Sequence, residues 1–484
     1  MCASTNHPSR PHIVLLISDQ HNAGLMGCAG DPWVRTPHLD QLAAEGCRFT
    51  QCYCNSPVCG PSRMSMLTGQ SPLHNGVLTN RQALASHIPT LAHALAAAGY
   101  DTVLCGRMHF IGPDQRHGFA ERLVGEFGPT DPAFRELDLG VFNHSTGQGR
   151  DTLRFNGPGQ GPGMHYDREV VDAACERIGT QDPTRPLFMV IGTHAPHNPY
   201  VCDPERFKAY QACLPRPDMA EIVNKHARAH PALRDWLAAR EMLNPDPVEL
   251  HRARAAYYGM VEEMDRQIGR AIACVDTHLG RENVYLGYGS DHGDLVGKNG
   301  MFWKSCFLDE AVKVPMIWRG PGIVPGRGCD ELISLLDLAP TLTEWGRTPS
   351  LPAAEGLSLV PLMRENPESL PEDRCIHSVL MDPRTGASLM LRQGPYKWVQ
   401  YARYPGIQWA DLRENDLWEE NTEPPPKFFD QRIPASWAPE AMEALGRLND
   451  QNNQILRQAA ERQEMPMIEP WQLDPAMFFL SGSG

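Results

Sequence analysis

Four apolar segments of this chain have the composition of buried β-strands, and each ends directly before polar residues that can bind a metal or an anion. They are residues 12–18, 102–105, 187–191 and 284–288. Predicted helices separate them, and such alternation is typical of a mostly parallel sheet flanked by helices on both faces. Ligands of such sheets bind beyond the carboxyl ends of the strands. We therefore predict an α/β fold whose site lies along that edge of the sheet.

The remainder of the first 370 residues gives further elements of the same kind. Helix patterns predict helices at 37–45, 88–98, 168–178, 253–275 and 334–345, and apolar runs predict strands at 47–53 and 314–318. Residues 145–163 are rich in glycine and are predicted to form a long surface loop. Residues 203–250 are polar and interrupted by proline, which predicts a helical insertion without a clear core face. We assign residues 1–370 to one α/β domain that contains this insertion.

The sequence pattern changes after residue 370. Short strand-like runs at 378–382, 388–392, 397–401 and 409–412, joined by turn residues, predict a small antiparallel sheet. We assign residues 371–484 to a C-terminal subdomain, which also holds a predicted helix at 439–462 and an apolar tail at 471–480. Because an exposed apolar tail is a liability, we expect it to pack on a neighbouring subunit in a homo-oligomer.

Charge, hydropathy and cysteine spacing limit the possible partners. The chain of 484 residues has a formal net charge of −14 and no basic patch, which argues against nucleic acid. No apolar run approaches the roughly 20 residues of a membrane span, so no membrane is expected. The first residues have no secretory pattern, so we expect a cytoplasmic protein whose 14 cysteines are mostly reduced. Zinc binding by Cys52, Cys54 and Cys59 is an alternative, but no second Cys/His pair has the spacing of a zinc site.

Residues 57–69 place a cysteine beside a predicted helix end. Pro61 suits the first turn of a helix, which makes Gly60 the expected N-cap and puts Cys59 just outside the helix. Free N–H groups and the helix dipole favour anions at such a position. Arg63 adds a permanent positive charge one turn further on. The segment indicates chemistry on an oxyanion ester, and the alternative is a buried structural cysteine at a turn.

Two strand ends far apart in the sequence carry a candidate metal site. Asp19 and Gln20 follow the first strand, and Asp291 and His292 follow the strand at 284–288. Three oxygen donors and one imidazole suit a hard divalent cation, with calcium expected first and manganese second. Taken singly, Asp19 could be a helix cap or a surface carboxylate, and the Asp-His pair a polar turn. The occurrence of both pairs at strand ends favours the metal site.

A second set of side chains is cationic or can carry a proton. It comprises Arg63, Arg107, His109, His194, His197 and Lys304. Several positive donors around a sulfate or phosphate group would stabilise its transition state, and a histidine could protonate the leaving alkoxide. Lys304 could instead be a surface lysine and His194 a hydrogen-bonded core residue. Of the two neighbouring histidines, His197 is therefore the better candidate.

With these residues in place, the chain resembles a type I sulfatase of the alkaline phosphatase superfamily. Residues 59–63, followed by Leu-Thr-Gly at 67–69, match the Cys-x-Pro-Ser-Arg signature of that family at every fixed position. Supporting matches over most of the chain are Asp19-Gln20, Gly106-x-x-His109, Pro196-His197-x-Pro199, Asp291-His292-Gly293-Asp294, Lys304 and Leu338-x-Pro340-Thr341. The sequence after Gly106 is similar to that of choline-sulfatase-like members. The Asp-Gln and Asp-His-Gly-Asp segments are similar to phosphonate monoester hydrolases.

The resemblance implies an alkaline phosphatase-like fold and a particular nucleophile. In the family, the signature cysteine is oxidised to formylglycine by a separate formylglycine-generating or anaerobic sulfatase-maturating enzyme. One hydroxyl of the hydrated aldehyde, activated by the metal, attacks sulfur, and the second hydroxyl later expels sulfate. Carried over to this chain, Cys59 becomes the nucleophile and, as formylglycine, a further ligand of the metal held by Asp19, Gln20, Asp291 and His292.

The resemblance also implies roles for the cationic residues. Arg63 would support the hydrate, His109 would contact it, and His197 and Lys304 would hold the ester and assist the leaving group. His194 would lie among the substrate-binding residues. Arg107 stands where the family usually has lysine, which changes the reach and geometry of that contact. Gln20 stands where many members have a second aspartate, which removes one negative charge from the metal site.

The expected reaction is hydrolysis of an alkyl, aryl or sugar sulfate ester. The nearest alternative is a phosphonate monoester or phosphodiester hydrolase with the same machinery. A third, from another class, is a non-catalytic protein that binds anions or glycans. The loop at 145–163 and the insertion at 203–250 are expected to select the leaving-group alcohol.

Overall fold

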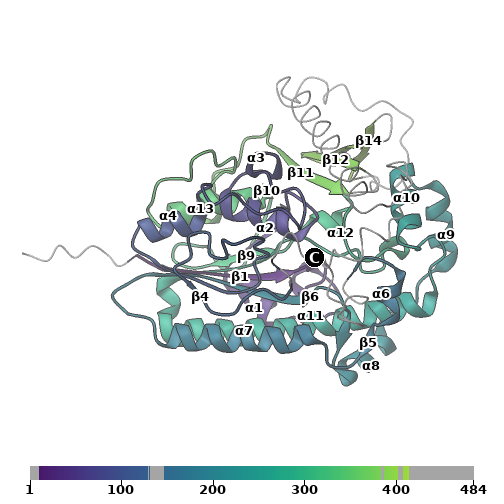
Figure 1. Cartoon of the computed structure of the whole chain (residues 1–484), viewed down its shortest axis with the longest axis horizontal. Helices are drawn as coiled ribbons and strands as arrows, with labels where there is room; N and C mark the ends of the chain where they lie inside the picture. Colours follow the sequence, from purple (N-terminus) through teal and green to yellow (C-terminus); the bar gives the residue numbers. More distant parts are fainter. Residues whose placement is uncertain (1–9, 129, 131–146, 383–385, 402–406, 414–484) are drawn as a thin grey trace, which may run out of the picture.

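The computed structural model of the chain describes residues 10–128, 130, 147–382, 386–401 and 407–413 (Figure 1). The predicted helix at 439–462 and the apolar tail at 471–480 lie outside these residues, and so does the oligomer contact expected of that tail. Within the described part of the chain, no helix combines the length and the apolar composition that crossing a membrane requires.

An eight-stranded sheet forms the centre of the molecule, in the order β10-β2-β9-β8-β1-β6-β3-β4. Its strands are β1 His12–Asp19, β2 Cys47–Tyr53, β3 Asp101–Gly106, β4 Glu121–Arg122, β6 Leu187–Pro196, β8 Val284–Ser290, β9 Met316–Arg319 and β10 Arg327–Ser334. Neighbouring strands are parallel except at β9, which runs antiparallel to both β8 and β2. The prediction of a large, mostly parallel sheet is confirmed.

Helices cover both faces of this sheet (Figure 1). One face carries α1 Pro37–Glu45, α7 Pro162–Gly179 and α11 Pro247–Val275, and the other carries α2 Cys59–Thr68, α4 Leu91–Ala97 and α13 Leu338–Trp345. The shorter elements between them are η1 Gly27–Ala29, α3 Pro72–Asn75, η2 Asp276–Gly280, η3 Arg281–Asn283, η4 Lys298–Gly300, α12 Asp309–Val312, η5 Leu335–Asp337 and α14 Val360–Met363. The central strand β1 is buried along its whole length, as its run of branched apolar residues requires.

The predicted start of one helix is wrong, and one strand was not predicted, both for local reasons. Helix α4 begins at Leu91 rather than at residue 88, because Thr90 and His93 form a capping box at its N-terminus. Strand β10 was not predicted, since its first half is polar and partly exposed.

The glycine-rich region at 147–163 is not a plain surface loop. It contains α6 Arg150–Arg154 and β5 Gly157–Pro158, and β5 pairs with β7 Val201–Cys202.

The insertion at 203–250 is helical, as predicted, but it does have a buried face. It forms α8 Pro204–Cys213, α9 Met219–Arg228 and α10 Pro231–Ala239, after which α11 begins. Each helix buries a few large side chains, among them Tyr210, Ile222 and Trp236. Helices this short contribute too few core positions for a clear periodicity, which explains why the sequence pattern missed this face.

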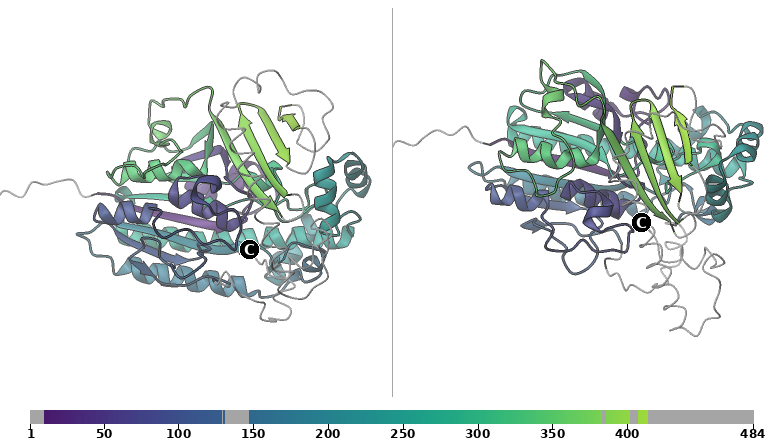
Figure 2. Two further views of the ribbon diagram at one scale, coloured as in Figure 1. Left: turned by 45° about the horizontal axis from the view of Figure 1, so that its top comes forward. Right: turned by 90° about the horizontal axis from the view of Figure 1, so that it is seen from above.

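The predicted C-terminal antiparallel sheet is confirmed. It consists of β11 Cys375–Asp382, β12 Gly386–Gln393, β13 Tyr396–Tyr401 and β14 Ile407–Asp411, in that order. Figure 2 shows these strands, in light green, beside the main body of the molecule. Ile376, Leu380 and Met390 of this sheet join the core that contains the central strands. The domain boundary at residue 370 stays a prediction.

Candidate active site

Cys59 is the first residue of α2 and is fully buried. The N–H of Ser62 donates to the carbonyl of Val58 over 3.1 Å, so Val58 is the N-cap and not Gly60. The predicted helix start was therefore two residues too late. Pro61 does not distinguish the two alternatives, because the N–H that it lacks would be free anywhere in the first turn. All ten residues of α2 are buried, so the helix end is held rigidly inside the molecule.

The two predicted strand-end pairs meet at one edge of the sheet. Strands β1 and β8 are adjacent and parallel, with Ser18 opposite Ser290, so the residues that follow them emerge side by side. Ligand atoms of Asp19, Cys59, Asp291 and His292 all lie within 4.8 Å of one another, and all four residues are buried. The Nε2 atom of His292 lies 3.7 Å from a carboxylate oxygen of Asp19 and 3.7 Å from one of Asp291.

The orientation of His292 suits a metal ligand. Its Nδ1 lies 3.0 Å from the carbonyl of Gly293, an oxygen that can only accept, so Nδ1 carries the proton. In the neutral ring the lone pair of Nε2 then faces the carboxylates of Asp19 and Asp291. A histidine held through its other nitrogen in this way is the usual arrangement of a metal-binding imidazole. The donor set therefore fits a divalent cation.

Two buried arginines balance the carboxylates. Arg63 donates from Nε to Asp291 over 2.7 Å and from Nη2 to Asp19 over 3.1 Å, and its Nη1 donates to the carbonyl of Arg107. The Nε of Arg107 donates to the same oxygen of Asp19. Burial opposes ionisation of Asp19, but Arg107 and Arg63 outweigh it and hold the pKa of this carboxyl far below its usual range. Arg63 therefore contacts both metal-site carboxylates, and its role in supporting the hydrate, which the family resemblance implies, stays a prediction.

The thiol of Cys59 lies between the acidic cluster and a group of cations. Its Sγ is 3.6 Å from Asp19 Oδ1, 3.0 Å from His292 Nε2 and 3.2 Å from Lys304 Nζ. Burial raises the pKa of this thiol, but the charges of Lys304 and His292, with hydrogen bonds from His109 and His197, bring it well below the usual value. The site thus stabilises a negative charge at the position of Sγ.

Lys304 is fully buried, so the alternative of a surface lysine is wrong. Its Nζ donates to Gln20 Oε1 over 2.7 Å and to His197 Nε2 over 2.8 Å. The Nδ1 of His197 lies 2.6 Å from the carbonyl of Asn198 and therefore carries the proton. Its Nε2 is the nitrogen that accepts a proton and faces the site.

The remaining predicted residues lie close to this centre. His109 accepts at Nδ1 from Arg107 over 3.2 Å. Both Gln20 and His109 have positive φ angles, 69° and 62°, a strained conformation for non-glycine residues that the surrounding structure must hold. The His194 ring is 5.0 Å from that of His197 and 4.3 Å from that of Phe127, between ring centroids. Burial and the neighbouring His197 lower the pKa of His194 far below its usual value, so this ring stays neutral.

Two residues that were given no role in the sequence analysis hold Gln20 in place. The Nε2 of Gln20 donates to Asp294 Oδ2, and the hydroxyl of Tyr200 donates to the same oxygen over 2.6 Å. The amide oxygen of Gln20 is thereby turned away from Asp294 and toward Lys304. Asp294 belongs to the Asp-His-Gly-Asp segment, which was the available sequence signal. Tyr200 gave no such signal, because a single tyrosine after a strand is common.

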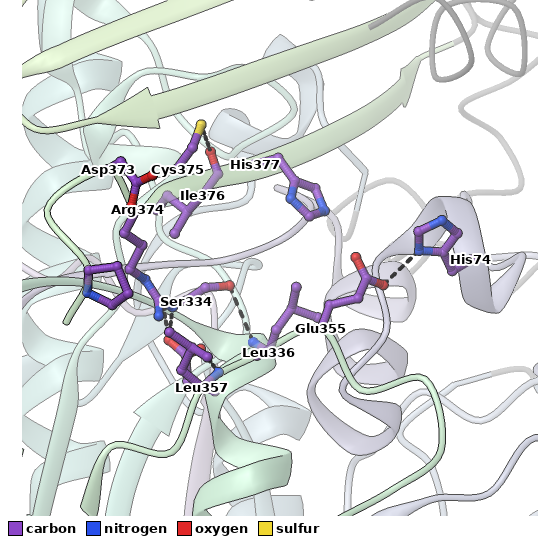
Figure 3. Close-up of a pocket in the computed structure, with 13 residues that line it drawn as sticks. His74, Ser334, Leu336, Glu355, Leu357, Asp373, Arg374, Cys375, Ile376 and His377 are labelled. Carbon is purple, nitrogen blue, oxygen red and sulfur yellow. Dashed lines mark hydrogen bonds and ion pairs between the residues drawn. The ribbon is translucent and has the colours of Figure 1, made fainter. Parts of the chain in front are cut away.

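A cavity lies elsewhere in the molecule. A cavity of about 490 Å³ lies between η5, α3 and β11 (Figure 3). Glu355 points toward His74 there, with 2.8 Å between Oε1 and Nδ1, and Arg374 pairs with Asp337. None of the residues around Cys59 lines this cavity, so it is separate from the candidate site.

Comparisons with known proteins identify the family of this chain. The Sulfatase family model matches residues 11–347. Choline-sulfatase of Rhizobium meliloti (strain 1021) is 30% identical over 501 residues, which cover 96% of this chain and 94% of that protein. Arylsulfatase of Clostridium perfringens (strain 13 / Type A) is 28% identical, over 74% of this chain and 79% of that protein.

The solved structures show the same architecture. The phosphonate monoester hydrolase of Agrobacterium radiobacter superposes with a TM-score of 0.71, covering 91% of this chain and 96% of that one. Its sequence identity of 22% makes this a likeness of fold alone. The family match and the choline-sulfatase relative carry the assignment of family. The protein belongs to the sulfatase family of sulfuric ester hydrolases and has the alkaline phosphatase-like fold.

Proposed function

We propose that this protein hydrolyses a sulfate ester with a nucleophile made by oxidising Cys59 to formylglycine. The observation that carries the proposal is the position of Cys59 Sγ. It lies between the carboxylate–imidazole cluster and the Lys304–His197 pair, within 3.6 Å of Asp19, His292 and Lys304. In the mature protein, a hydroxyl of the hydrated aldehyde would occupy the place of this sulfur. The maturing enzyme, formylglycine-generating or anaerobic, is part of the proposal.

The metal in this proposal is a divalent cation, calcium first and manganese second. Asp19, Gln20, Asp291 and His292 would hold it together with formylglycine 59, since carboxylate and amide oxygens are the ligands that hard cations prefer. When bound, it would supply the positive charge that activates the nucleophile and neutralises sulfate oxygens. Arg63 and Arg107 keep Asp19 ionised for this purpose. Asp294 and Tyr200 fix the orientation of the Gln20 amide.

The cationic residues act on the ester and on its leaving group. Lys304 Nζ can donate to sulfate oxygens or to the bridging oxygen as charge develops on it. His197 can carry a proton at Nε2 to the departing alkoxide, because Asn198 holds its Nδ1–H and fixes the ring. His109, which donates a hydrogen bond to Cys59, can donate in the same way to a hydroxyl of the hydrate.

The test is production of the chain together with a formylglycine-generating enzyme. Mass spectrometry of the Cys59 peptide measures the conversion, and kcat/KM is then measured on 4-nitrophenyl sulfate, choline sulfate, a sugar sulfate and an aryl phosphonate monoester. We expect activity on sulfates that scales with conversion and is lost in Cys59→Ala, whereas Cys213→Ala at an exposed cysteine changes nothing. Full activity of a protein whose Cys59 is wholly thiol would refute the formylglycine mechanism.

A phosphonate monoester or phosphodiester hydrolase is the second candidate. The presence of Gln20 in place of a second aspartate favours it, because it matches the Asp-Gln text of phosphonate monoester hydrolases. Both kinds of substrate are tetrahedral anionic esters, so the same donors would serve either. A preference of several orders of magnitude for the aryl phosphonate in kcat/KM would replace the sulfatase proposal with this one. Ligand binding without turnover of any ester would favour the third, non-catalytic alternative.

A further inference from the structure

We infer that, as long as Cys59 keeps its thiol, the buried cluster of Asp19, Cys59, Asp291 and His292 is a zinc site. The chemical state of residue 59 would then decide which metal the protein holds. This inference does not depend on which ester the mature protein hydrolyses. It concerns the unmodified chain and a soft metal, whereas the proposed function concerns the modified chain and a hard one.

The spacing of the four ligand atoms fits a tetrahedral zinc ion. Bonds of about 2.0 to 2.3 Å at tetrahedral angles place neighbouring ligand atoms roughly 3.3 to 3.6 Å apart. Here Cys59 Sγ is 3.0 Å from His292 Nε2 and 3.6 Å from Asp19 Oδ1. His292 Nε2 is 3.7 Å from Asp19 Oδ1 and 3.7 Å from Asp291 Oδ1. The remaining separations, from Asp291 to Asp19 and to Cys59, are no more than 4.8 Å, so inward shifts of these side chains would complete the tetrahedron.

The types of ligand favour zinc over calcium. A thiolate and an imidazole are the donors that zinc prefers, whereas calcium prefers six to eight oxygen atoms. Gln20, the remaining oxygen donor at these strand ends, directs its amide oxygen to Lys304 in this structure. As the sulfur–zinc bond forms, the Cys59 thiol releases its proton to solvent. Conversion of Cys59 to an oxygen-bearing side chain removes the soft donor, so maturation would change the metal preference of the site.

The zinc form would be inactive as an esterase. Four protein ligands complete the coordination of a structural zinc ion, and a catalytic zinc ion needs an open position for water or substrate. The sulfur also occupies the place at which the proposed nucleophile stands. Zinc would thus hold the unmodified chain in a closed, metal-loaded and unreactive state.

Metal binding by the unmodified protein tests the inference. The chain is produced without a maturing enzyme, mass spectrometry verifies the thiol at Cys59, and Zn²⁺ affinity is measured by competition with a chromophoric chelator. Ca²⁺ affinity is measured by calorimetry. The matched variant is Cys59→Ser, which replaces the sulfur with oxygen, and Cys213→Ser at an exposed cysteine is the control. We expect Cys59→Ser to bind Zn²⁺ at least about 100-fold more weakly, with Ca²⁺ affinity changed by less than about 10-fold.

Co²⁺ provides a second readout, and in the wild-type protein it does not depend on how the variant folds. We expect the wild-type protein to show a thiolate-to-cobalt charge-transfer band in the near ultraviolet, and Cys59→Ser to lack it. Absence of that band in wild type, or equal Zn²⁺ affinity in wild type and Cys59→Ser, would overturn the inference. Neither result bears on sulfate ester hydrolysis by the matured protein, which its own kinetic assay decides.

Discussion

Arg63 donates from Nε to Asp291 Oδ2 over 2.7 Å, and both side chains are fully buried. Through Nη2 the same guanidinium reaches Asp19, so one arginine joins the carboxylates that follow two different strands. A planar, forked cation can hold two carboxylates in this way, and a lysine ammonium cannot reproduce the geometry. The spacing of the two acidic candidate ligands therefore depends on a residue of the cysteine-bearing helix.

We expect Arg63→Lys to destabilise the fold by about 3 kcal/mol, because it leaves a buried carboxylate without its partner. Urea unfolding measures this change. The control is Arg281→Lys, which alters a pair with Glu45 in which the arginine is 47% exposed, and which we expect to change stability by less than about 1 kcal/mol. Equal effects of the two substitutions would contradict the role assigned to Arg63.

His197→Gln tests the assignment of the proton donor. Loss of a general acid typically costs about 10² to 10⁴ in rate when the leaving group is a poor one. We expect a loss of that size in kcat/KM for an alkyl sulfate and a much smaller one for 4-nitrophenyl sulfate, whose phenolate leaves without a proton. His194→Gln is the control and should show no such dependence on the leaving group. Equal losses on both substrates in His197→Gln would remove His197 from this role.

Asp294 is not a predicted metal ligand, but Asp294→Asn should weaken metal binding through its contact with Gln20. An asparagine at this position can present its NH₂ group to Gln20, so the Gln20 amide no longer has a single preferred orientation. We expect Ca²⁺ affinity to fall about 10- to 100-fold, as measured by calorimetry. Tyr200→Phe removes one hydrogen bond from Asp294 and should have a smaller effect in the same direction. Tyr258→Phe, whose hydroxyl donates to Asp31 instead, should leave the affinity unchanged.

Asp265 on α11 gives the fold a dependence on pH outside the site. Its carboxylate accepts from the backbone N–H groups of His38 and Leu39 at the start of α1, and burial raises its pKa to about 7. The folded state therefore binds a proton that the unfolded state, with an ordinary carboxyl pKa, releases near pH 4. The contribution of Asp265 to the free energy of unfolding of the wild type is therefore lost as the pH rises from about 4 to 7.

Asp265→Asn does not titrate and should lack this loss. We expect the difference in free energy of unfolding, variant minus wild type, to become more positive as the pH rises from 5 to 8. Urea unfolding at several pH values measures the shift. A difference between the two proteins that is the same at every pH would show that Asp265 does not titrate in this range.

Much of the candidate site was predictable because its residues follow buried strands. The β1 and β8 runs are apolar and short, and the adjacent parallel pairing of these strands brings Asp19 and Asp291 to one edge of the sheet. The direction of individual side chains was not predictable. Nothing in the residue pattern indicates that Arg63 joins the carboxylates of Asp19 and Asp291. That choice depends on how α2 packs over the sheet edge.

The features that the sequence analysis missed are those with weak local signals. Strand β10 begins with polar residues at an edge of the sheet, and the insertion helices α8, α9 and α10 each bury only a few side chains. The start of α2 was misplaced because Pro61 is compatible with more than one position in a first turn. Asp294 and Tyr200 became visible as positioning residues only through their contacts with Gln20.

The complete burial of α2 bears on whether Cys59 is modified before or after the chain folds. Cys59 and the whole helix that carries it are buried, so this segment is not accessible to another enzyme once the chain has folded. We therefore expect any conversion of this residue to take place on the nascent polypeptide, before the helix packs. A molecule that folds first keeps its thiol until it is degraded. The fraction of catalytically competent molecules would thus depend on the rate of Cys59 modification relative to the rate of folding during synthesis.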